Sequence, residues 1–285
     1  MSLKTCITNY SFARSLRAGT MNVEQFCDFC GREGFDGVEL ISYFWKDKEA
    51  ELKALPGWLR RNKITLAGYG TRSNFLSKDP GEVEQSFANI RSAIEDSRRI
   101  GAKTCRVFGG SKLEGWTVDA AHKQVVESFQ KLMPQAEKEG VCLVIENHGG
   151  FPATADEVVA VIKGVNSPCF ASLLDTGNFL SAGDDPLAAA KTLMPYVRHV
   201  HVKDLLKFPA GSPRGHKCAR ADYNLDSCVV GDGVVPNREI FAALKAAGWN
   251  GFLSIEAEGP ENMEDAPRVL AGLANIRKWL KEIGK

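Results

Sequence analysis

Short apolar or β-branched runs alternate with longer amphipathic segments along the whole chain. The runs predict strands at residues 3–9, 37–42, 64–69, 103–108, 141–146, 170–175, 197–203 and 251–256. The segments between them have helical periodicity and predict helices at residues 22–33, 48–62, 80–100, 117–139, 154–164, 185–195, 236–247 and 262–282. Each predicted strand is therefore followed by a predicted helix.

This alternation predicts an α/β fold with a parallel sheet, and eight units are enough to close the sheet into a barrel. An open doubly wound sheet is the alternative. That fold normally carries a glycine-rich phosphate loop after its first strand, whereas residues 8–12 read TNYSF here. We therefore predict a single (β/α)8 TIM barrel domain over residues 1–285.

One connection in this pattern is much longer than the others. Residues 204–235 separate the seventh predicted strand from the next helix, and a βα loop of that length is usually functional, such as a lid. The predicted long loop carries Arg214, His216 and Lys217, which could bind an anionic part of a substrate. A solvated charged loop is the alternative. Arg214 and His216 are our predicted substrate-binding residues in this segment.

Charge and composition exclude several classes of function. Lys and Arg number 36 against 35 Asp and Glu, a net charge of +1, so no global field attracts nucleic acid or an anionic membrane. No apolar run reaches the roughly 18 residues of a membrane span. The first six residues lack the apolar run of a signal peptide. We expect a cytoplasmic protein with no nucleic-acid or membrane partner.

The eight cysteines are too sparse for a disulfide scaffold. Cys27 and Cys30 form a CxxC pair, but they lie within a helical pattern, and no second pair with zinc-ligand spacing follows. A redox or zinc function is the alternative to our interpretation, which is that both are small packed side chains.

Four consecutive predicted strands carry possible metal ligands at or near their carboxyl ends: Glu146, Asp175, His201 and Glu256. Because barrel active sites lie at the carboxyl ends of the strands, we expect these side chains to converge. Three carboxylates brought together would repel each other and lose hydration unless they are protonated, ion-paired or metal-bound. Pairing with Lys203, Arg106 or nearby backbone amides is the alternative, but the pattern over four adjacent strands favours a bound cation. Three carboxylates and one imidazole suit Mn²⁺, Mg²⁺ or Co²⁺.

Several phrases of the sequence resemble a known group of proteins. They are GFDGVEL at 34–40, VIENH at 144–148, LDTGN at 174–178, HVHVKD at 199–204, GDGVVP at 231–236 and IE at 255–256. Together they resemble the xylose isomerase-like TIM-barrel superfamily, in particular the branch labelled sugar phosphate isomerase/epimerase. That branch includes keto-sugar 3-epimerases, hydroxypyruvate isomerase, inosose dehydratase and a 3-dehydroshikimate dehydratase. The resemblance covers strands two to eight.

The resemblance implies that Glu146, Asp175, His201 and Glu256 bind one divalent metal ion. Mn²⁺ is expected, with Mg²⁺, Co²⁺ or Zn²⁺ as alternatives. It also implies that Glu146 and Glu256 transfer the proton, alternating as base and acid on the two sides of the substrate carbon. Many relatives carry a histidine where this chain has Asn178. Asparagine can hydrogen-bond a hydroxyl but cannot titrate near neutral pH, so this position departs from the ketose epimerases and inosose dehydratase.

Three further residues near the same rim are predicted to contact substrate: His148, Asn178 and Lys203. The alternatives are a loop or capping histidine, a turn asparagine, and a lysine held in a salt bridge to Glu146 or Glu256. His199 lies two residues deeper than His201, and we expect it in an interior polar layer that supports the site.

These observations predict a divalent-metal-dependent sugar isomerase or epimerase that transfers a proton next to a carbonyl through an enediolate. The alternative is a metal-dependent dehydratase or lyase of a keto-polyol or 3-keto-glycoside, and a non-catalytic sugar-binding barrel is a further one. The superfamily also includes a three-zinc DNA endonuclease, but five histidines and a net charge of +1 argue against it. The expected partner is a small carbohydrate, and by analogy with the superfamily we expect a homodimer or homotetramer.

Overall fold

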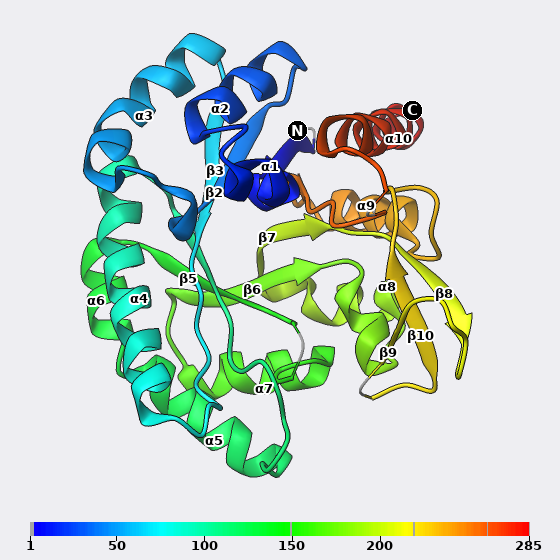
Figure 1. Cartoon of the computed structure of the whole chain (residues 1–285). Coiled ribbons are helices and arrows are strands. Elements are labelled where there is room, and N and C mark those ends of the chain that lie inside the picture. Colours follow the sequence, from blue (N-terminus) through cyan, green and yellow to red (C-terminus); the bar gives the residue numbers. More distant parts are fainter. Residues whose placement is uncertain (1–2, 149, 219, 261, 285) are drawn as a thin grey trace.

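The computed structural model describes residues 3–148, 150–218, 220–260 and 262–284. The ends of the predicted domain, Met1, Ser2 and Lys285, lie outside the described residues. Eight parallel strands form a closed barrel with helices around it (Figure 1). The predicted α/β fold, a (β/α)8 TIM barrel, is therefore confirmed.

The barrel strands follow each other around the ring in the order β1-β11-β7-β6-β5-β4-β3-β2. Their bounds are β1 (Lys4–Thr8), β2 (Gly37–Ile41), β3 (Thr65–Gly70), β4 (Thr104–Val107), β5 (Cys142–Glu146), β6 (Phe170–Asp175), β7 (Val197–Val202) and β11 (Phe252–Ile255). Each corresponds to one predicted strand. The apolar runs identify them because barrel strands are covered by helices on the outside and by other side chains on the inside.

Helices connect these strands and cover the outside of the barrel. Their bounds are α2 (Val23–Arg32), α3 (Lys48–Asn62), α4 (Pro80–Ile100), α5 (Val118–Gln130), α6 (Met133–Glu139), α7 (Ala155–Val165), α8 (Pro186–Leu193), α9 (Asn237–Ala246) and α10 (Asp265–Gly284). Short 3-10 helices add η1 (Asn9–Phe12), η2 (Ser42–Phe44), η3 (Asn178–Ala182) and η4 (Met194–Tyr196). None of the described helices is both long and apolar enough to cross a membrane.

Two parts of the helix prediction were wrong. The single helix predicted at 117–139 is two helices, α5 and α6, because Pro134 lies in the first turn of α6 and has no N–H to continue the ladder from α5. A short helix after β1, α1 (Ala13–Ala18), was not predicted. Its apolar positions are few, and it ends at Gly19 in a left-handed conformation.

The apolar core divides into an outer shell and a small interior cluster. In β5, Leu143 and Ile145 pack outward among the helices, whereas Val144 faces inward and packs with Ala171 and Leu173 of β6. The interior above this apolar layer is filled mainly by polar side chains that are themselves buried. These side chains form the candidate site described below.

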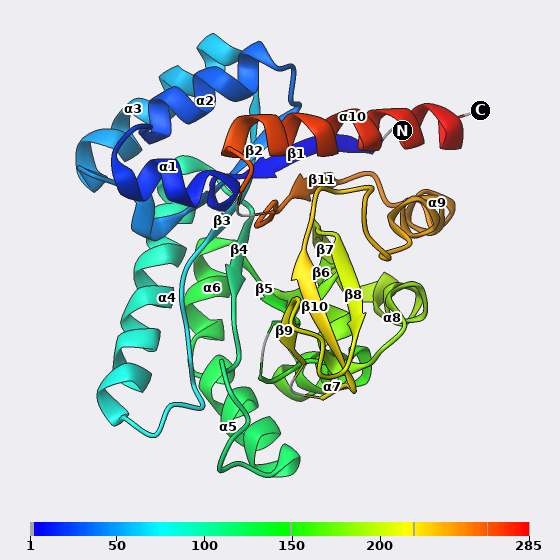
Figure 2. The same cartoon turned by 45° about the vertical axis from the view of Figure 1, so that its right-hand side comes forward.

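The segment after β7 is not the long loop that the sequence predicted. It folds into a three-stranded antiparallel sheet of β8 (Leu205–Pro209), β10 (Tyr223–Ser227) and β9 (His216–Lys217), in the order β8-β10-β9. Figure 2 shows this sheet beside the end of β7. The strands escaped prediction because they are short, and residues 210–215, which separate β8 from β9, contain proline and glycine, so no periodic run is long enough to stand out.

Asp204 anchors both ends of this sheet to the barrel. Its buried carboxylate accepts hydrogen bonds from the backbone N–H groups of Leu205, Gly231, Gly233 and Val235, at 2.8 to 3.2 Å. Gly233 has to be a glycine for this contact, because a Cβ there would lie 2.1 Å from the Asp204 carboxylate. The anchor therefore fixes where the segment leaves β7 and where it returns toward α9.

We expect Asp204→Ala to lower the thermal unfolding midpoint by roughly 5 °C, since four backbone N–H groups lose a charged acceptor in a buried place. Asp232→Ala is the matched control, because Asp232 is exposed and its side chain makes no hydrogen bond among the described residues. It should shift the midpoint by less than about 1 °C. Equal shifts for the two variants, measured by differential scanning calorimetry, would show that Asp204 is not the anchor.

Candidate metal and active site

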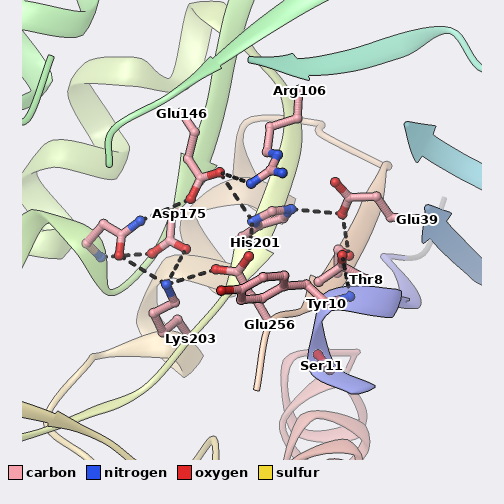
Figure 3. A network of polar contacts seen from close by, with 12 residues as sticks. Thr8, Tyr10, Ser11, Glu39, Arg106, Glu146, Asp175, His201, Lys203 and Glu256 are labelled. Carbon is pink, nitrogen blue, oxygen red and sulfur yellow. Dashed lines mark hydrogen bonds and ion pairs between the residues drawn. The ribbon is translucent and has the colours of Figure 1, made fainter. Parts of the chain in front are cut away.

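The structure brings the four predicted metal ligands to one point at the carboxyl end of the barrel. Glu146, Asp175, His201 and Glu256 each offer an atom, and these atoms lie within 4.8 Å of one another. All four side chains are buried (Figure 3). We call this group the carboxylate–histidine cluster.

Strand pairing explains why these residues meet. Asp175 at the end of β6 is the register partner of His201 in β7, and Ser254 in β11 is the partner of the same histidine on the other side. Glu256 follows two residues after Ser254, and its backbone N–H donates to Val202 at 3.0 Å. Because side chains alternate between the two faces of a strand, residues at these register positions point into the barrel together.

Two buried cations neutralise part of the negative charge. The ammonium of Lys203 lies 2.8 Å from Glu256, 3.2 Å from Glu258 and 3.7 Å from Asp175. On the opposite side of the cluster, Arg106 Nη1 donates to Glu146 Oε2 at 3.3 Å. The sequence analysis gave these two ion pairs as the alternative to metal binding. In the structure the ion pairs form, and the four predicted ligands also lie together.

The three carboxyl groups of the cluster differ in their pKa values. Burial, reinforced by the charge of Glu256, raises the pKa of Glu146. Burial also raises the pKa of Asp175 to about 6, although Lys203 opposes it. Burial acts in the same direction on Glu256, but Lys203 and His201 outweigh it and lower its pKa to about 2. The carboxylate beside the ammonium is therefore ionised, while the other two are more easily protonated.

Some atoms that face the centre of the cluster have no hydrogen-bond partner among the described residues. His201 Nδ1 lies 3.6 Å from Glu256 and 3.8 Å from Glu146, and it makes no hydrogen bond. Asp175 Oδ2 also makes none. Buried polar atoms are normally paired, so unpaired atoms that surround one point fit a bound cation. The three oxygen ligands and one nitrogen ligand are a donor set that divalent ions accept.

His201 is held from behind by a residue that the sequence analysis missed. Its Nε2 lies 2.8 Å from Glu39 Oε2, on the side away from the cluster. Burial would lower the pKa of His201, but Glu39, Glu256 and Glu146 together raise it to about 10. The sequence did contain a sign of this role, because Glu39 is an acidic residue inside the otherwise apolar strand GVELI. Every position of that strand is buried in the structure.

Two other residues of the site were not predicted as site residues. Tyr10, from η1, lies beside Glu256 and is half-buried (Figure 3). Glu258 is the exposed neighbour of Lys203 at the mouth. Tyr10 lies in a short 3-10 helix and Glu258 in irregular chain, each just after a barrel strand, where sequence periodicity gives no information on position.

The remaining predicted residues have different surroundings. Asn178 contacts the cluster, because its Nδ2 donates to Glu146 at 3.1 Å and its Oδ1 accepts from Lys203 at 3.2 Å. His148 lies at the mouth against Phe108 and lines a cavity of about 510 Å³ between α4 and the loops after β3, β4 and β5. His199 lies deeper in the barrel and contacts Glu39.

His216 lies in β9 and Arg214 in the turn before it, and neither is a member of the cluster. The exposed guanidinium of Arg214 stacks on Phe208 at 4.4 Å. His216 lines a second cavity, of about 700 Å³, between the sheet and the loop after β4. No contact joins either residue to the four ligands among the described parts of the chain, so their role in substrate binding stays a prediction.

The two cysteines of the CxxC pair are buried and unbridged in α2. Burial raises the pKa of Cys27 to about 12, and burial also raises the pKa of Cys30. Both thiols are therefore protonated at neutral pH, which fits the packing interpretation.

Comparison with known proteins gives consistent matches over most of the chain. The family described as xylose isomerase-like TIM barrel matches residues 27–282. An inosose dehydratase of Clostridium perfringens (strain 13 / Type A) is 27% identical over 265 residues, which cover 87% of this chain and 86% of that protein.

Solved structures with the same fold include two that contain bound groups. The IOLI protein with a binding zinc atom has a TM-score of 0.79 at 18% identity and covers 99% of both chains. A D-psicose 3-epimerase with D-tagatose from Clostridium cellulolyticum H10 has a TM-score of 0.75 at 20% identity, with 98% of this chain and 99% of that chain covered.

We expect Lys203→Met to destabilise the metal-free protein by about 3 to 5 kcal/mol at pH 7.5, because buried carboxylates lose their ammonium partner. The loss should shrink toward pH 5, since the carboxylates that Lys203 no longer stabilises can then take up protons. Lys207→Met is the control, because Lys207 is exposed and only stacks on Tyr223. Denaturant unfolding at the two pH values measures both effects, and a loss that is independent of pH would contradict this electrostatic role.

Proposed function

Since the chain belongs to the xylose isomerase-like TIM barrel family, we propose that it is a metal-dependent lyase that removes water from a keto-polyol such as an inosose. The observation that carries the proposal is the buried group of three carboxylates and one histidine with unpaired atoms facing a common centre. Elimination is preferred to isomerisation because several inosose dehydratases are among the curated relatives that match most of this chain.

Glu146, Asp175, His201 and Glu256 are the residues that would hold one divalent cation. When bound, the cation supplies Lewis-acid polarisation of the substrate carbonyl, which acidifies the neighbouring C–H bond. Mn²⁺ is the ion we propose for three carboxylates and one imidazole. Zn²⁺ is the alternative, because the similar IOLI protein was solved with zinc.

Glu146 and Glu256 are the proposed proton-transfer residues. They come from β5 and from the segment after β11, and they approach His201 Nδ1 at 3.8 and 3.6 Å. One carboxylate takes the proton from the carbon next to the carbonyl. The electron pair of that C–H bond then forms a C=C bond, the C–O bond at the β carbon breaks, and the leaving hydroxyl takes up a proton to depart as water.

Three other side chains would bind the oxygens of the substrate. Arg106 is buried beside Glu146, and its Nε and Nη2 make no hydrogen bond among the described residues. A guanidinium stays charged, so these N–H groups can bind a substrate oxygen throughout the reaction. Lys203 and Asn178 are linked to each other and to the two proton-transfer carboxylates, so they can orient a hydroxyl between them.

Isomerisation or epimerisation is the second candidate, because it shares the first step. One glutamate comes from β5 and the other from the segment after β11, so one could remove a proton and the other return it on the opposite face. The two reactions diverge once the proton has been removed. In a lyase the β C–O bond breaks, whereas in an epimerase the carbon is protonated again.

Proton NMR in D₂O separates these reactions. With Mn²⁺-treated protein and a panel of inososes, keto-sugars and 3-keto-glycosides, we expect loss of the proton next to the carbonyl together with formation of an unsaturated or diketone product. Glu146→Gln and Glu256→Gln should each slow this by about 10² to 10⁴-fold, as expected for removal of a proton-transfer group. Deuterium incorporation or inversion without loss of water would favour the epimerase. Metal binding with no exchange in any substrate would favour a non-catalytic sugar-binding barrel.

Removal of the metal should abolish turnover, and Mn²⁺ should restore it. Because His201 has a pKa of about 10 without metal, it is protonated at pH 7.5 and has to lose its proton to become a ligand. We therefore expect about one proton to be released per metal bound, and weaker binding as the pH falls. Calorimetry in buffers of different ionisation enthalpy measures the proton count. A count near zero would contradict ligation by His201.

A further inference from the structure

Glu39 is the most deeply buried carboxylate that the proposed reaction does not use. It comes from β2 and reaches into the barrel interior toward β7 and β11, where one of its oxygens meets three donors. His201 Nε2 lies 2.8 Å from Oε2, Ser254 Oγ 2.9 Å and His199 Nε2 3.0 Å. The side chain has no exposed surface. A carboxylate in this place cannot touch a substrate at the barrel mouth.

The two nitrogens of His201 face opposite ways. Nε2 points to Glu39, while Nδ1 faces Glu146 and Glu256 and has no hydrogen-bond partner. A neutral imidazole carries one N–H. If Nε2 carries it and donates to Glu39, Nδ1 has its lone pair free toward the centre of the cluster. The contact with Glu39 therefore fixes both the tautomer and the ring orientation.

His199 and Ser254 keep Glu39 in this position. Both donate to the same oxygen as His201, so the carboxylate cannot rotate away without losing three hydrogen bonds at once. The arrangement is thus a support built from three strands, β2, β7 and β11.

A second metal ion between Glu39, His199 and His201 is the competing explanation, since these three could also form a ligand group. The distances argue against it. Both ring nitrogens approach one oxygen at 2.8 and 3.0 Å, which is hydrogen-bond geometry, and the hydroxyl of Ser254 occupies a third position around that oxygen. Because the two ring nitrogens and the hydroxyl all point at Glu39 Oε2, they leave no space between them for a metal ion.

We propose that Glu39 is a positioning residue that holds His201 with Nε2 protonated, so that Nδ1 is presented to the metal. This inference rests on the proposed metal site and adds to it the residue that sets the ligand tautomer. Carboxylates that bind the far nitrogen of a metal-bound histidine typically change metal affinity by about 10 to 100-fold when they are removed. The proposed role of Glu39 therefore predicts an effect on metal affinity that does not depend on which substrate the protein binds.

The test is metal affinity of the full-length variants, measured with Zn²⁺ by competition against a chelating dye. Glu39→Gln keeps the size of the side chain but removes its charge, and we expect it to weaken Zn²⁺ binding about 10 to 100-fold. Ser254→Ala is the matched control. It removes the hydroxyl that donates to the same Glu39 oxygen but leaves the Glu39–His201 contact, so we expect a change in affinity of less than about threefold and a comparable loss of thermal stability.

A measurement on the unsubstituted protein keeps the inference testable if Glu39→Gln does not fold. In Zn²⁺-loaded protein with ¹⁵N-labelled histidine, NMR should identify His201 Nδ1 as the metal-bound nitrogen and give a downfield, slowly exchanging proton on Nε2. Metal bound through Nε2, two Zn²⁺ ions per chain, or equal affinities for Glu39→Gln and the unsubstituted protein would overturn the inference. Absence of any Zn²⁺ uptake by the unsubstituted protein would overturn the proposed metal site itself.

Discussion

The burial of three carboxylates at one point of the barrel is the constraint on which the rest of the site depends. Glu146, Asp175 and Glu256 are nearly inaccessible, so their charges cannot be stabilised by water. The fold compensates with Lys203 and other cations placed on different sides of the group. A divalent ion completes the same balance, because it adds positive charge where Nδ1 of His201 and Oδ2 of Asp175 make no hydrogen bond among the described residues.

Much of the fold and the central residues of the site could be predicted from the sequence. The barrel strands are short apolar runs with turn residues at both ends, and that signal needs no information on distant contacts. The four proposed ligands were found for a similar reason. Glu146, Asp175 and Glu256 lie at or directly after the ends of the fifth, sixth and eighth barrel strands. In a parallel barrel these strand ends meet at one rim whatever the detailed packing.

Residues that act across the barrel could not be predicted in the same way. Glu39 comes from a strand three places from β7 in the ring, so its contact with His201 depends on barrel closure and on side-chain reach. The sequence suggested Arg106 only as a salt-bridge partner of the carboxylates. Its role in substrate binding could not be predicted, because a strand sequence does not show which guanidinium N–H groups lack a hydrogen-bond partner. The small sheet of residues 205–227 was missed because antiparallel pairing over a few residues depends on turns more than on periodicity.

The Asp204 anchor has a consequence for how this barrel can diversify. One carboxylate holds both ends of the inserted sheet, directly after Lys203 in the chain. The intervening residues can therefore change in length and composition while the exit and the return of the chain remain where they are. Evolution could exchange this module to alter what reaches the mouth without disturbing the lysine beneath it, so that substrate choice and proton chemistry are inherited separately.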